Sequence, residues 1–327
     1  MRTPSMLLAA AVVANLQCIQ PAPAQEWPSR PLTMVVPFAA GGGADLLGRI
    51  LAPPLSELLG QPVTVENIGG GGGTTGSLRV SRAAPDGYQF VLGTAGTHSQ
   101  SQSLYKNPLY NAATDFAPVA LVAEQPILLI ARKDFPADNL ADFIAYTRAN
   151  RDRMQFGSAG TGSGVHLACV LFNAAIGVKV VHVPYRGTAP AMQDLIAGRI
   201  DYQCPVITPA VPQIQSRLVK AIATLTKKRT PILPDLATAQ EQGLKDFEAY
   251  IWFAIFLPKD TPAEIVRKLQ RAIAAAEHLP LVQERLKDIG AAPIAPERQT
   301  PEYLAAFVER EIEKWAAPIK ASGISAD

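Results

Sequence analysis

The chain carries near its start the stretch Val35-Val36-Pro37-Phe38-Ala39-Ala40-Gly41-Gly42-Gly43-Ala44-Asp45. A short apolar run over 32–36 ends at a proline, and leucine and isoleucine then recur at helical spacing through 46–55. Three consecutive glycines let the backbone turn with positive φ and bring its N–H groups close to a ligand. The stretch predicts a strand, a glycine turn and a helix whose N-terminus binds an anion.

The same arrangement returns about half a chain later, in Met154-Gln155-Phe156-Gly157-Ser158-Ala159-Gly160-Thr161-Gly162-Ser163-Gly164. A short strand again leads through a Gly/Ser/Thr loop into a helix. Two anion-binding loops on separate αβ units indicate one ligand held from both sides. A third glycine run, 69–73, follows a strand at 63–65, and we expect it to be a solvated loop.

Length and charge narrow the class of protein. At 327 residues the chain exceeds one typical domain, which favours two domains. The 30 basic and 28 acidic residues leave a net charge of +2, and the densest basic cluster, Lys227-Lys228-Arg229, is too short for a nucleic-acid-binding face. We therefore expect no nucleic-acid partner.

Residues 1–24 have the pattern of a secretory signal peptide. Arg2 precedes an apolar run over 6–14, and Ala22-Pro23-Ala24 supplies a small-residue cleavage pattern. Cys18 does not follow the small residues that a lipoprotein needs before its acylated cysteine. No later apolar run approaches the ~18 residues of a membrane-spanning helix. We expect cleavage near Ala24 and a periplasmic, monomeric protein without direct membrane insertion.

The mature chain would keep two cysteines, Cys169 and Cys204. An oxidising compartment permits a disulfide between them, but the sequence leaves their pairing open. For Cys169, on an apolar helix face, a small buried thiol is the ordinary expectation.

From Trp27 onward, short apolar strands alternate with amphipathic helices. This rhythm predicts a mainly parallel sheet with helices on both faces, whose ligands bind at the carboxyl ends of the strands. Thr94, at the end of one such strand, is therefore a candidate ligand contact. In this part of the chain we expect strands at 32–37, 63–66 and 88–94, and helices at 44–59 and 74–83.

A second αβ series follows two apolar segments, 119–123 and 127–131. It ends in a turn-rich segment with a short helix after Asp235, then an apolar strand and three closing helices. The expected strands are 154–157, 179–183, 200–204, 218–223 and 250–257, and the expected helices are 139–150, 163–176, 188–197, 262–277, 280–289 and 301–320.

Two apolar crossings, near 124 and 251, suggest a double hinge. On this interpretation lobe 1 is discontinuous, residues 25–123 plus 252–327, and lobe 2 is residues 124–251. Trp252 and Phe253, in the second crossing, are expected in the core, with the cleft wall as the alternative.

The sequence offers no visible site for catalysis. Ser163 lacks the glycines two residues to either side that a nucleophile elbow needs. No histidine pair or cysteine cluster has metal-ligand spacing, and the glycine loops match neither the Walker A nor the dinucleotide-binding pattern. We therefore expect no catalytic residue, no metal and no cofactor.

Three side chains near the loops each have two alternative roles. His166 either donates to a ligand carboxylate or braces the second loop through backbone hydrogen bonds. Tyr185, within His182-Val183-Pro184-Tyr185-Arg186-Gly187, either donates its hydroxyl into the cleft or packs its ring over the loop. Asp45 is expected to cap the first helix rather than to bind a cationic ligand group.

A set of segments, in chain order, covers essentially the whole mature chain. They are Trp27-Pro28-Ser29-Arg30-Pro31, residues 36–45, Val65-Glu66-Asn67, Pro85-Asp86-Gly87-Tyr88, Asp115-Phe116-Ala117-Pro118-Val119, residues 158–163 with His166, residues 182–187, Leu233-Pro234-Asp235, Trp315 and residues 319–324. By these segments the chain resembles the tripartite tricarboxylate transporter substrate-binding proteins, the extracytoplasmic Bug receptor family.

The resemblance implies a type II periplasmic-binding fold of the α/β class, with two αβ lobes joined by a double hinge around a central ligand cleft. It also implies a receptor that captures a small carboxylate and delivers it to membrane transporter subunits. In the family, backbone N–H groups and hydroxyls of the two loops hold the carboxylate. By position these are Phe38, Ala39, Gly42 and Ala44 of the first loop and Ser158, Ala159, Thr161, Gly162 and Ser163 of the second, and His166 and Tyr185 fall in matching motifs.

One segment bears on the choice of ligand. Asp201-Tyr202-Gln203-Cys204-Pro205 offers no carboxylate for an amino-acid ammonium unless Asp201 points inward. This disfavours amino acids and favours a dicarboxylate, a tricarboxylate or an aromatic carboxylate. Two alternatives remain open: a sensory receptor feeding a signalling partner, and an exported enzyme acting on a carboxylate.

Overall fold

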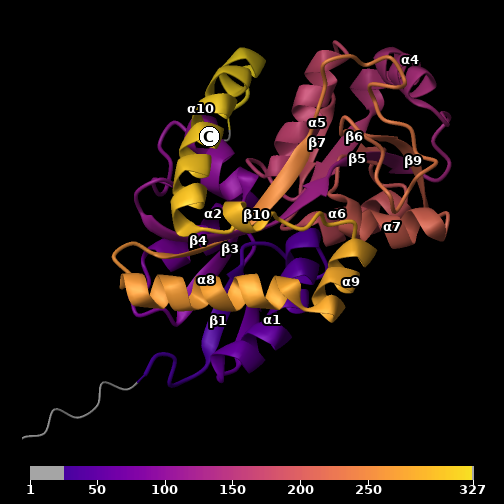
Figure 1. Ribbon diagram of the computed structural model, residues 1–327. Coiled ribbons are helices and arrows are strands. Elements are labelled where there is room, and N and C mark those ends of the chain that lie inside the picture. Colours follow the sequence, from indigo (N-terminus) through magenta and orange to yellow (C-terminus); the bar gives the residue numbers. More distant parts are fainter. Residues whose placement is uncertain (1–25, 326–327) are drawn as a thin grey trace, which may run out of the picture.

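The computed structural model of the chain describes residues 26–325. Two α/β lobes, each built on a five-stranded sheet, lie side by side (Figure 1). The predicted signal peptide and its cleavage point lie outside the described residues. Within 26–325 no helix has both the length and the apolar character needed to cross a membrane.

The sheet of the first lobe has the strand order β2-β1-β3-β10-β4. β1 pairs in parallel with β2 and β3, whereas β10 runs antiparallel between β3 and β4. Four of the five strands therefore run in one direction, as expected for a mainly parallel sheet, and β10, which returns from the second lobe, runs opposite to them. The strands are β1 (Leu32–Val36), β2 (Val63–Asn67), β3 (Gln89–Thr94), β4 (Phe116–Pro126) and β10 (Tyr250–Pro258).

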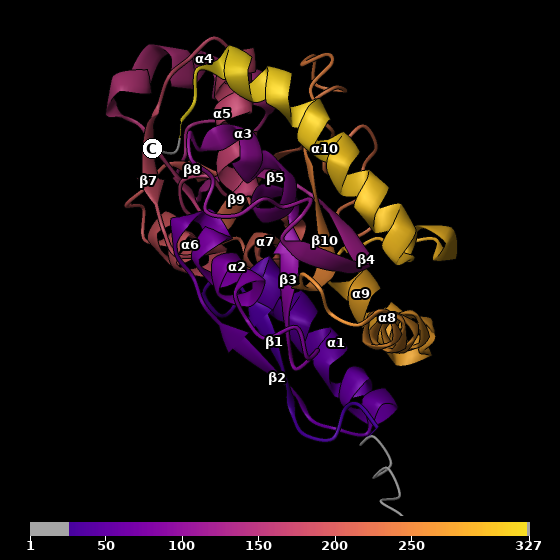
Figure 2. The same cartoon turned by 90° about the vertical axis from the view of Figure 1, so that its left-hand side faces the viewer.

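Helices cover both faces of this sheet, and their buried residues recur at helical spacing. The long α10 runs diagonally beside β10 and β4 (Figure 2). It is fixed there because the indole N–H of buried Trp252 donates to Oε2 of Glu311 at 3.0 Å. The helices and short helical turns of the lobe are α1 (Gly43–Leu59), η1 (Gly71–Gly73), α2 (Thr74–Ser81), η2 (Gly96–Gln100), α3 (Ser101–Leu104), α8 (Ala263–His278), α9 (Pro280–Asp288), η4 (Pro296–Arg298) and α10 (Pro301–Ser322).

The sheet of the second lobe has the order β7-β6-β8-β5-β9. β6 is parallel to β7 and β8, whereas β5 is antiparallel to β8 and β9. The sequence interpretation missed α7, because Pro209 and Pro212 argue against a helix. The elements are β5 (Leu128–Arg132), α4 (Leu140–Asn150), η3 (Arg151–Arg153), β6 (Gln155–Ser158), α5 (Gly164–Ala175), β7 (Val181–Pro184), α6 (Thr188–Ile196), β8 (Tyr202–Gln203), α7 (Ile207–Gln215) and β9 (Val219–Thr224).

A disulfide joins Cys169 of α5 to Cys204, the residue after β8. The two Cα atoms are 5.4 Å apart and both side chains are buried. The pairing that the sequence left open is therefore present, and the expectation of a free thiol at Cys169 is wrong.

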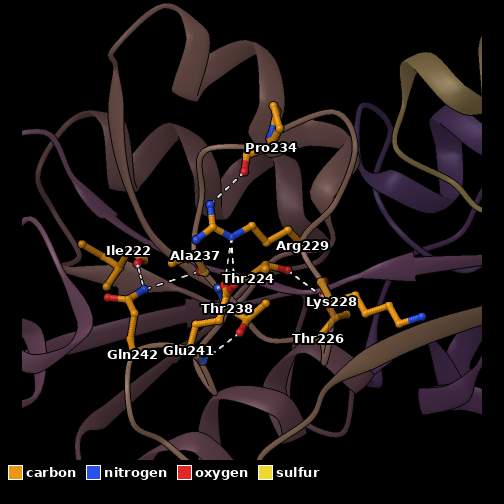
Figure 3. Close-up of polar contacts among 10 residues, drawn as sticks. All are labelled: Ile222, Thr224, Thr226, Lys228, Arg229, Pro234, Ala237, Thr238, Glu241 and Gln242. Atoms are coloured by element: carbon orange, nitrogen blue, oxygen red, sulfur yellow. Dashed lines mark hydrogen bonds and ion pairs between the residues drawn. The ribbon is translucent and has the colours of Figure 1, made fainter.

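The segment between β9 and β10 contains turns instead of the expected short helix. Gly243 and Asp246 adopt left-handed φ values of 97° and 58°, which end any helical run. Polar contacts hold the segment in place (Figure 3): Arg229 Nε donates to Glu241 Oε2 at 2.9 Å, and Gln242 Nε2 donates to the carbonyl of Ile222 at 2.9 Å.

The two lobes are joined by a pair of neighbouring strands. β4 and β10 pair antiparallel up to the point where the chain passes between the lobes, with Ile251 opposite Gln125 and Tyr250 opposite Pro126. The link between the lobes at this point is therefore a hydrogen-bonded ribbon of two strands.

Candidate functional site

A small cavity lies between the lobes, where α1, α5 and α6 begin. Its volume is about 40 Å³. The residues around it come from both lobes and from the linking strand β10. They are Phe38, Gly42, Gly43, Ala44, Thr94, Ala159, Ser163, Gly164, Val165, Thr188, Val206, Ile251 and Phe253.

The first loop, between β1 and α1, is held by Asp45. Its buried carboxylate accepts the backbone N–H of Gly41 at 2.8 Å and the side-chain amide of Asn67 at 2.9 Å, and it pairs with Arg49 at 3.0 Å. Burial raises the pKa of Asp45, but the hydrogen bonds from Arg49, Gly41 and Asn67 outweigh it and lower the pKa overall. Asp45 therefore stays ionised and shapes the loop from inside.

The second loop, between β6 and α5, is closed by its own polar groups. The carbonyl of Gly160 accepts the hydroxyl of Ser163 at 2.7 Å and the N–H of Ser163 at 3.1 Å. The Ser163 hydroxyl oxygen also accepts the N–H of His166 at 3.3 Å, which makes Ser163 the N-cap of α5. Ser158 Oγ accepts the N–H of Gly160 at 3.1 Å. The loop is thus pre-formed around the carbonyl of Gly160.

Two neighbouring histidines, whose rings are tilted against each other, support the second loop. His166 Nδ1 accepts the N–H of Gly162 at 3.3 Å, and His182 Nε2 is hydrogen-bonded to Ser158 Oγ at 2.7 Å. Burial lowers the pKa of His166 to about 3, with a further contribution from His182, and burial lowers the pKa of His182 to about 4. Both rings are neutral at pH 7, as suits a position beside a helix N-terminus.

Tyr185 and Ala39 make their contacts away from the cavity wall. The Tyr185 hydroxyl donates to Oδ2 of Asp194 at 2.7 Å, and burial together with this carboxylate raises the pKa of Tyr185. The backbone N–H of Ala39 donates across the lobes to the carbonyl of Arg186 at 3.0 Å.

The structure divides the residues predicted from sequence into two groups. Those on the cavity wall are Phe38, Gly42, Ala44, Thr94, Ala159 and Ser163. The other predicted residues, which do not line the cavity, are Ala39, Ser158, Thr161, Gly162, His166 and Tyr185. Trp252 and Phe253 both lie in the core, as expected, and Phe253 also borders the cavity, which was the alternative.

Several wall residues escaped the sequence interpretation. Thr188 begins α6 directly after Gly187, so it carried the same glycine-then-helix signal as the two loops. Val206 and Ile251 are apolar residues far apart in the chain, and no local pattern marks them.

The wall attracts anions without a charged side chain. None of the described residues around the cavity is Lys, Arg, Asp or Glu. The first N–H groups of α1, α5 and α6 have no partner within their helices, and each helix N-terminus carries partial positive charge. The wall also contains apolar side chains, namely Phe38, Val165, Val206, Ile251 and Phe253. Such a site fits a small organic anion.

Metal binding finds no support in residues 26–325, where no group of three or more His, Cys, Asp and Glu side chains is placed to hold an ion.

The fold and this cavity together define a two-lobed solute receptor of the periplasmic binding protein class. The chain belongs to the tripartite tricarboxylate transporter family of receptors: the family model described as "Tripartite tricarboxylate transporter family receptor" matches residues 47–324.

Individual relatives are similar to this chain over most of its length. The structure of the periplasmic binding protein BugD is 43% identical with a TM-score of 0.89, covering 91% of this chain and 99% of that one. MatC from Rhodopseudomonas palustris with bound malate is 40% identical with a TM-score of 0.87, covering 90% and 100%. A UPF0065 protein of Agrobacterium vitis, from the TAR-I ttuE-ttuC' intergenic region, is 42% identical over 297 residues, which are 91% of this chain and 86% of the relative.

Proposed function

We propose that the protein is an extracytoplasmic receptor that captures a small carboxylate between its lobes and delivers it to a tripartite tricarboxylate-type membrane transporter. One observation carries the proposal: the N-termini of α1, α5 and α6 meet at a single cavity with no charged side chain in its wall. A carboxylate there would be neutralised by backbone N–H groups.

The site residues divide by the part they would play. The wall residues Phe38, Gly42, Ala44, Thr94, Ala159 and Ser163 would contact the ligand directly. The second group, Ala39, Ser158, Thr161, Gly162, His166 and Tyr185, would keep the loops in the shape that presents those contacts. For His166 this favours the bracing alternative, since its Nδ1 already accepts the Gly162 N–H.

The ligand class we propose is a dicarboxylate, a tricarboxylate or an aromatic carboxylate. Asp201, the carboxylate that could hold an amino-acid ammonium, accepts Arg132 Nε at 3.1 Å and the N–H of Gln155 at 2.8 Å. Gln155 is the first residue of β6, whereas the cavity lies beyond the other end of that strand. Asp201 is thus committed elsewhere, and the malate bound to MatC is consistent with an acid lacking an ammonium group.

We propose the two-lobe division predicted from the sequence for the working protein. Lobe 1 would comprise residues 25–123 plus 252–327 and lobe 2 residues 124–251, moving about the crossings near 124 and 251. The mature protein would act in the periplasm as a monomer, with the transporter subunits as its protein partners and no cofactor.

A thermal-shift screen of the mature protein, residues 25–327, tests the proposal. The panel holds dicarboxylates, tricarboxylates, aromatic carboxylates and amino acids. A ligand at a hundredfold its Kd should stabilise the fold by ~2.7 kcal/mol. Gly42→Leu should abolish the shift, because even the Cβ atom would lie 2.9 Å from Thr188 Oγ1.

Gly60→Leu is the matched control, because no atom lies within 4 Å of a Cβ at Gly60 and α1 ends there. A panel without a single shift, or a shift that survives Gly42→Leu, counts against a carboxylate receptor with this cavity.

A further inference from the structure

Around the cavity the two lobes touch through backbone at three glycines of the first lobe. A Cβ atom on Gly72 would lie 2.3 Å from the carbonyl oxygen of Thr161. One on Gly96 would lie 2.5 Å from the amide nitrogen of Gly164, and one on Gly69 would lie 2.7 Å from the carbonyl oxygen of Arg186. We call Gly69, Gly72 and Gly96 the seam glycines.

These separations leave no room for any side chain. Cβ atoms essentially never come closer than 3.0 Å to another heavy atom, and ordinary contact begins at 3.4 Å. An alanine at Gly72 or Gly96 would therefore force the lobes apart by about 1 Å. The run 69–73, expected from sequence to be a solvated loop, is instead part of the contact between the lobes, and Gly72 and Gly73 are buried.

The second lobe meets the seam with glycines of its own. A Cβ atom on Gly160 would lie 3.1 Å from the amide nitrogen of Gly72, and one on Gly162 would lie 2.8 Å from the Tyr105 hydroxyl oxygen. That hydroxyl donates at 3.1 Å to the carbonyl of Gly71 and at 3.4 Å to that of Thr161, one in each lobe.

The seam borders the cavity directly. Gly164, which faces Gly96, lines the cavity, and Thr161 stands two residues before the wall residue Ser163. The depth to which the lobes close at the seam therefore sets the size of the cavity. With the seam in contact, the cavity has its volume of about 40 Å³.

We propose that the seam glycines determine ligand specificity, because they set how far the lobes close; this inference rests on the proposed receptor function. A ligand short enough for the closed cavity lets the seam form. A longer ligand holds the seam open and loses its contacts. Because a ligand shifts closure only by its preference for the closed state, the seam contacts favour ligands that fit.

Closure can be tested without any ligand by a disulfide trap. A Cβ atom on Gly41 would lie 3.4 Å from the Cβ of Ala189 in the other lobe, with no other atom within 4 Å. This is close to the spacing of disulfide-bonded cysteines. The double variant Gly41→Cys/Ala189→Cys should therefore cross-link under mild oxidation, and the native cysteines do not interfere because they are already paired.

Gly96→Ala in this trap background should slow cross-linking at least tenfold. The φ of Gly96 lies outside the left-handed region, so alanine adds no backbone strain, and the three nearest atoms that its Cβ would meet all belong to the second lobe. Gly69→Ala, also free of left-handed strain, is the second variant should Gly96→Ala not fold. Gly60→Ala is the control: its φ of 70° makes alanine strained, yet nothing lies within 4 Å of its Cβ.

Two results would overturn the proposal at this stage. One is a trap background that does not cross-link, because the lobes then do not meet at the seam. The other is Gly96→Ala cross-linking as fast as the background.

Titration calorimetry with linear dicarboxylates from malonate to suberate tests specificity. The wild type should prefer one short dicarboxylate. Its affinity for suberate, the longest acid, should be at least tenfold weaker than for that preferred acid. Gly96→Ala should bind the preferred acid at least tenfold more weakly and discriminate less by length, while Gly60→Ala keeps the wild-type profile. An unchanged profile in Gly96→Ala contradicts the specificity role. If the trap behaves as expected and no acid binds the wild type, the carboxylate receptor is refuted and the closure role of the seam is retained.

Discussion

The rings of His166 and His182 lie 4.1 Å apart between their centroids, beneath the second loop. Both rings also lie near the ring of Phe156, with centroid distances of 6.3 Å for His166 and 4.9 Å for His182. The groups hydrogen-bonded to them, the N–H of Gly162 and the hydroxyl of Ser158, are uncharged. His166 is buried and His182 is half-buried, both in neutral form beside the start of α5, and a proton on either ring would meet the other ring and the helix dipole.

This pair makes the protein sensitive to acid. The folded pKa values, about 3 for His166 and about 4 for His182, lie below the ordinary histidine pKa of 6.5. The unfolded chain thus binds more protons between pH 6.5 and 4, so stability is complete above pH 6.5 and declines as the pH falls through this window. His182→Gln should reduce the loss between pH 7 and 4.5 by ~2 kcal/mol, after allowance for partial exposure. Urea unfolding at both pH values measures it, and equal losses in variant and wild type would count against the pair.

Glu277 should give a pH dependence of the opposite sign. Burial raises its pKa to about 8, against a smaller lowering by the Gln299 amide that donates to it. The folded carboxyl keeps a proton that the unfolded one releases above pH 4.5, so its contribution to stability is lost as the pH rises from 4.5 through 8. Relative to wild type, Glu277→Gln should gain on the order of 3 kcal/mol between pH 5 and 8.5. A constant difference in unfolding free energy across that range would contradict the assignment.

Removal of the disulfide should destabilise the fold while leaving its architecture intact. Cys169 and Cys204 are 35 residues apart, and a loop of this length corresponds to about 3–4 kcal/mol in the chain-entropy account. The double variant Cys169→Ala/Cys204→Ala should lose this amount in urea unfolding, with an unchanged far-ultraviolet circular dichroism spectrum. The wild type unfolded in reductant is the comparison, and its curve should approach that of the variant.

Glu311 should be more important for stability than other carboxylates of α10. It is 5% exposed, and its Oε2 accepts both Trp252 Nε1 at 3.0 Å and Trp315 Nε1 at 3.1 Å. Glu311→Ala leaves the buried Trp252 N–H without a partner and should cost about 2–3 kcal/mol, whereas Glu311→Gln should cost less because an amide oxygen still accepts. Glu309→Ala, at an exposed position of the same helix, should change the melting temperature little. Equal melting temperatures for the alanine variants would argue against this role.

The sequence predicted most strands and helices because each has its own local signal. The glycine turn before α1 and the Gly/Ser/Thr loop before α5 could be predicted for the same reason. Failure came where local chemistry and structure disagree: α7 forms despite two prolines, and the turns after Asp235 replace a helix. Gly72 was misread because its partner, Thr161, is distant in the chain, and only the packing of the two lobes shows why that position excludes a side chain.

The paired strands β4 and β10 also bear on how the receptor can move. Two strands joined by hydrogen bonds bend across their flat face far more readily than they stretch or slide past one another. On the proposed hinge, opening would be a single bending of this strand pair, whereas one linker would permit rotation in many directions. Each closure on that hinge would bring Gly72 back to Thr161 and Gly96 back to Gly164.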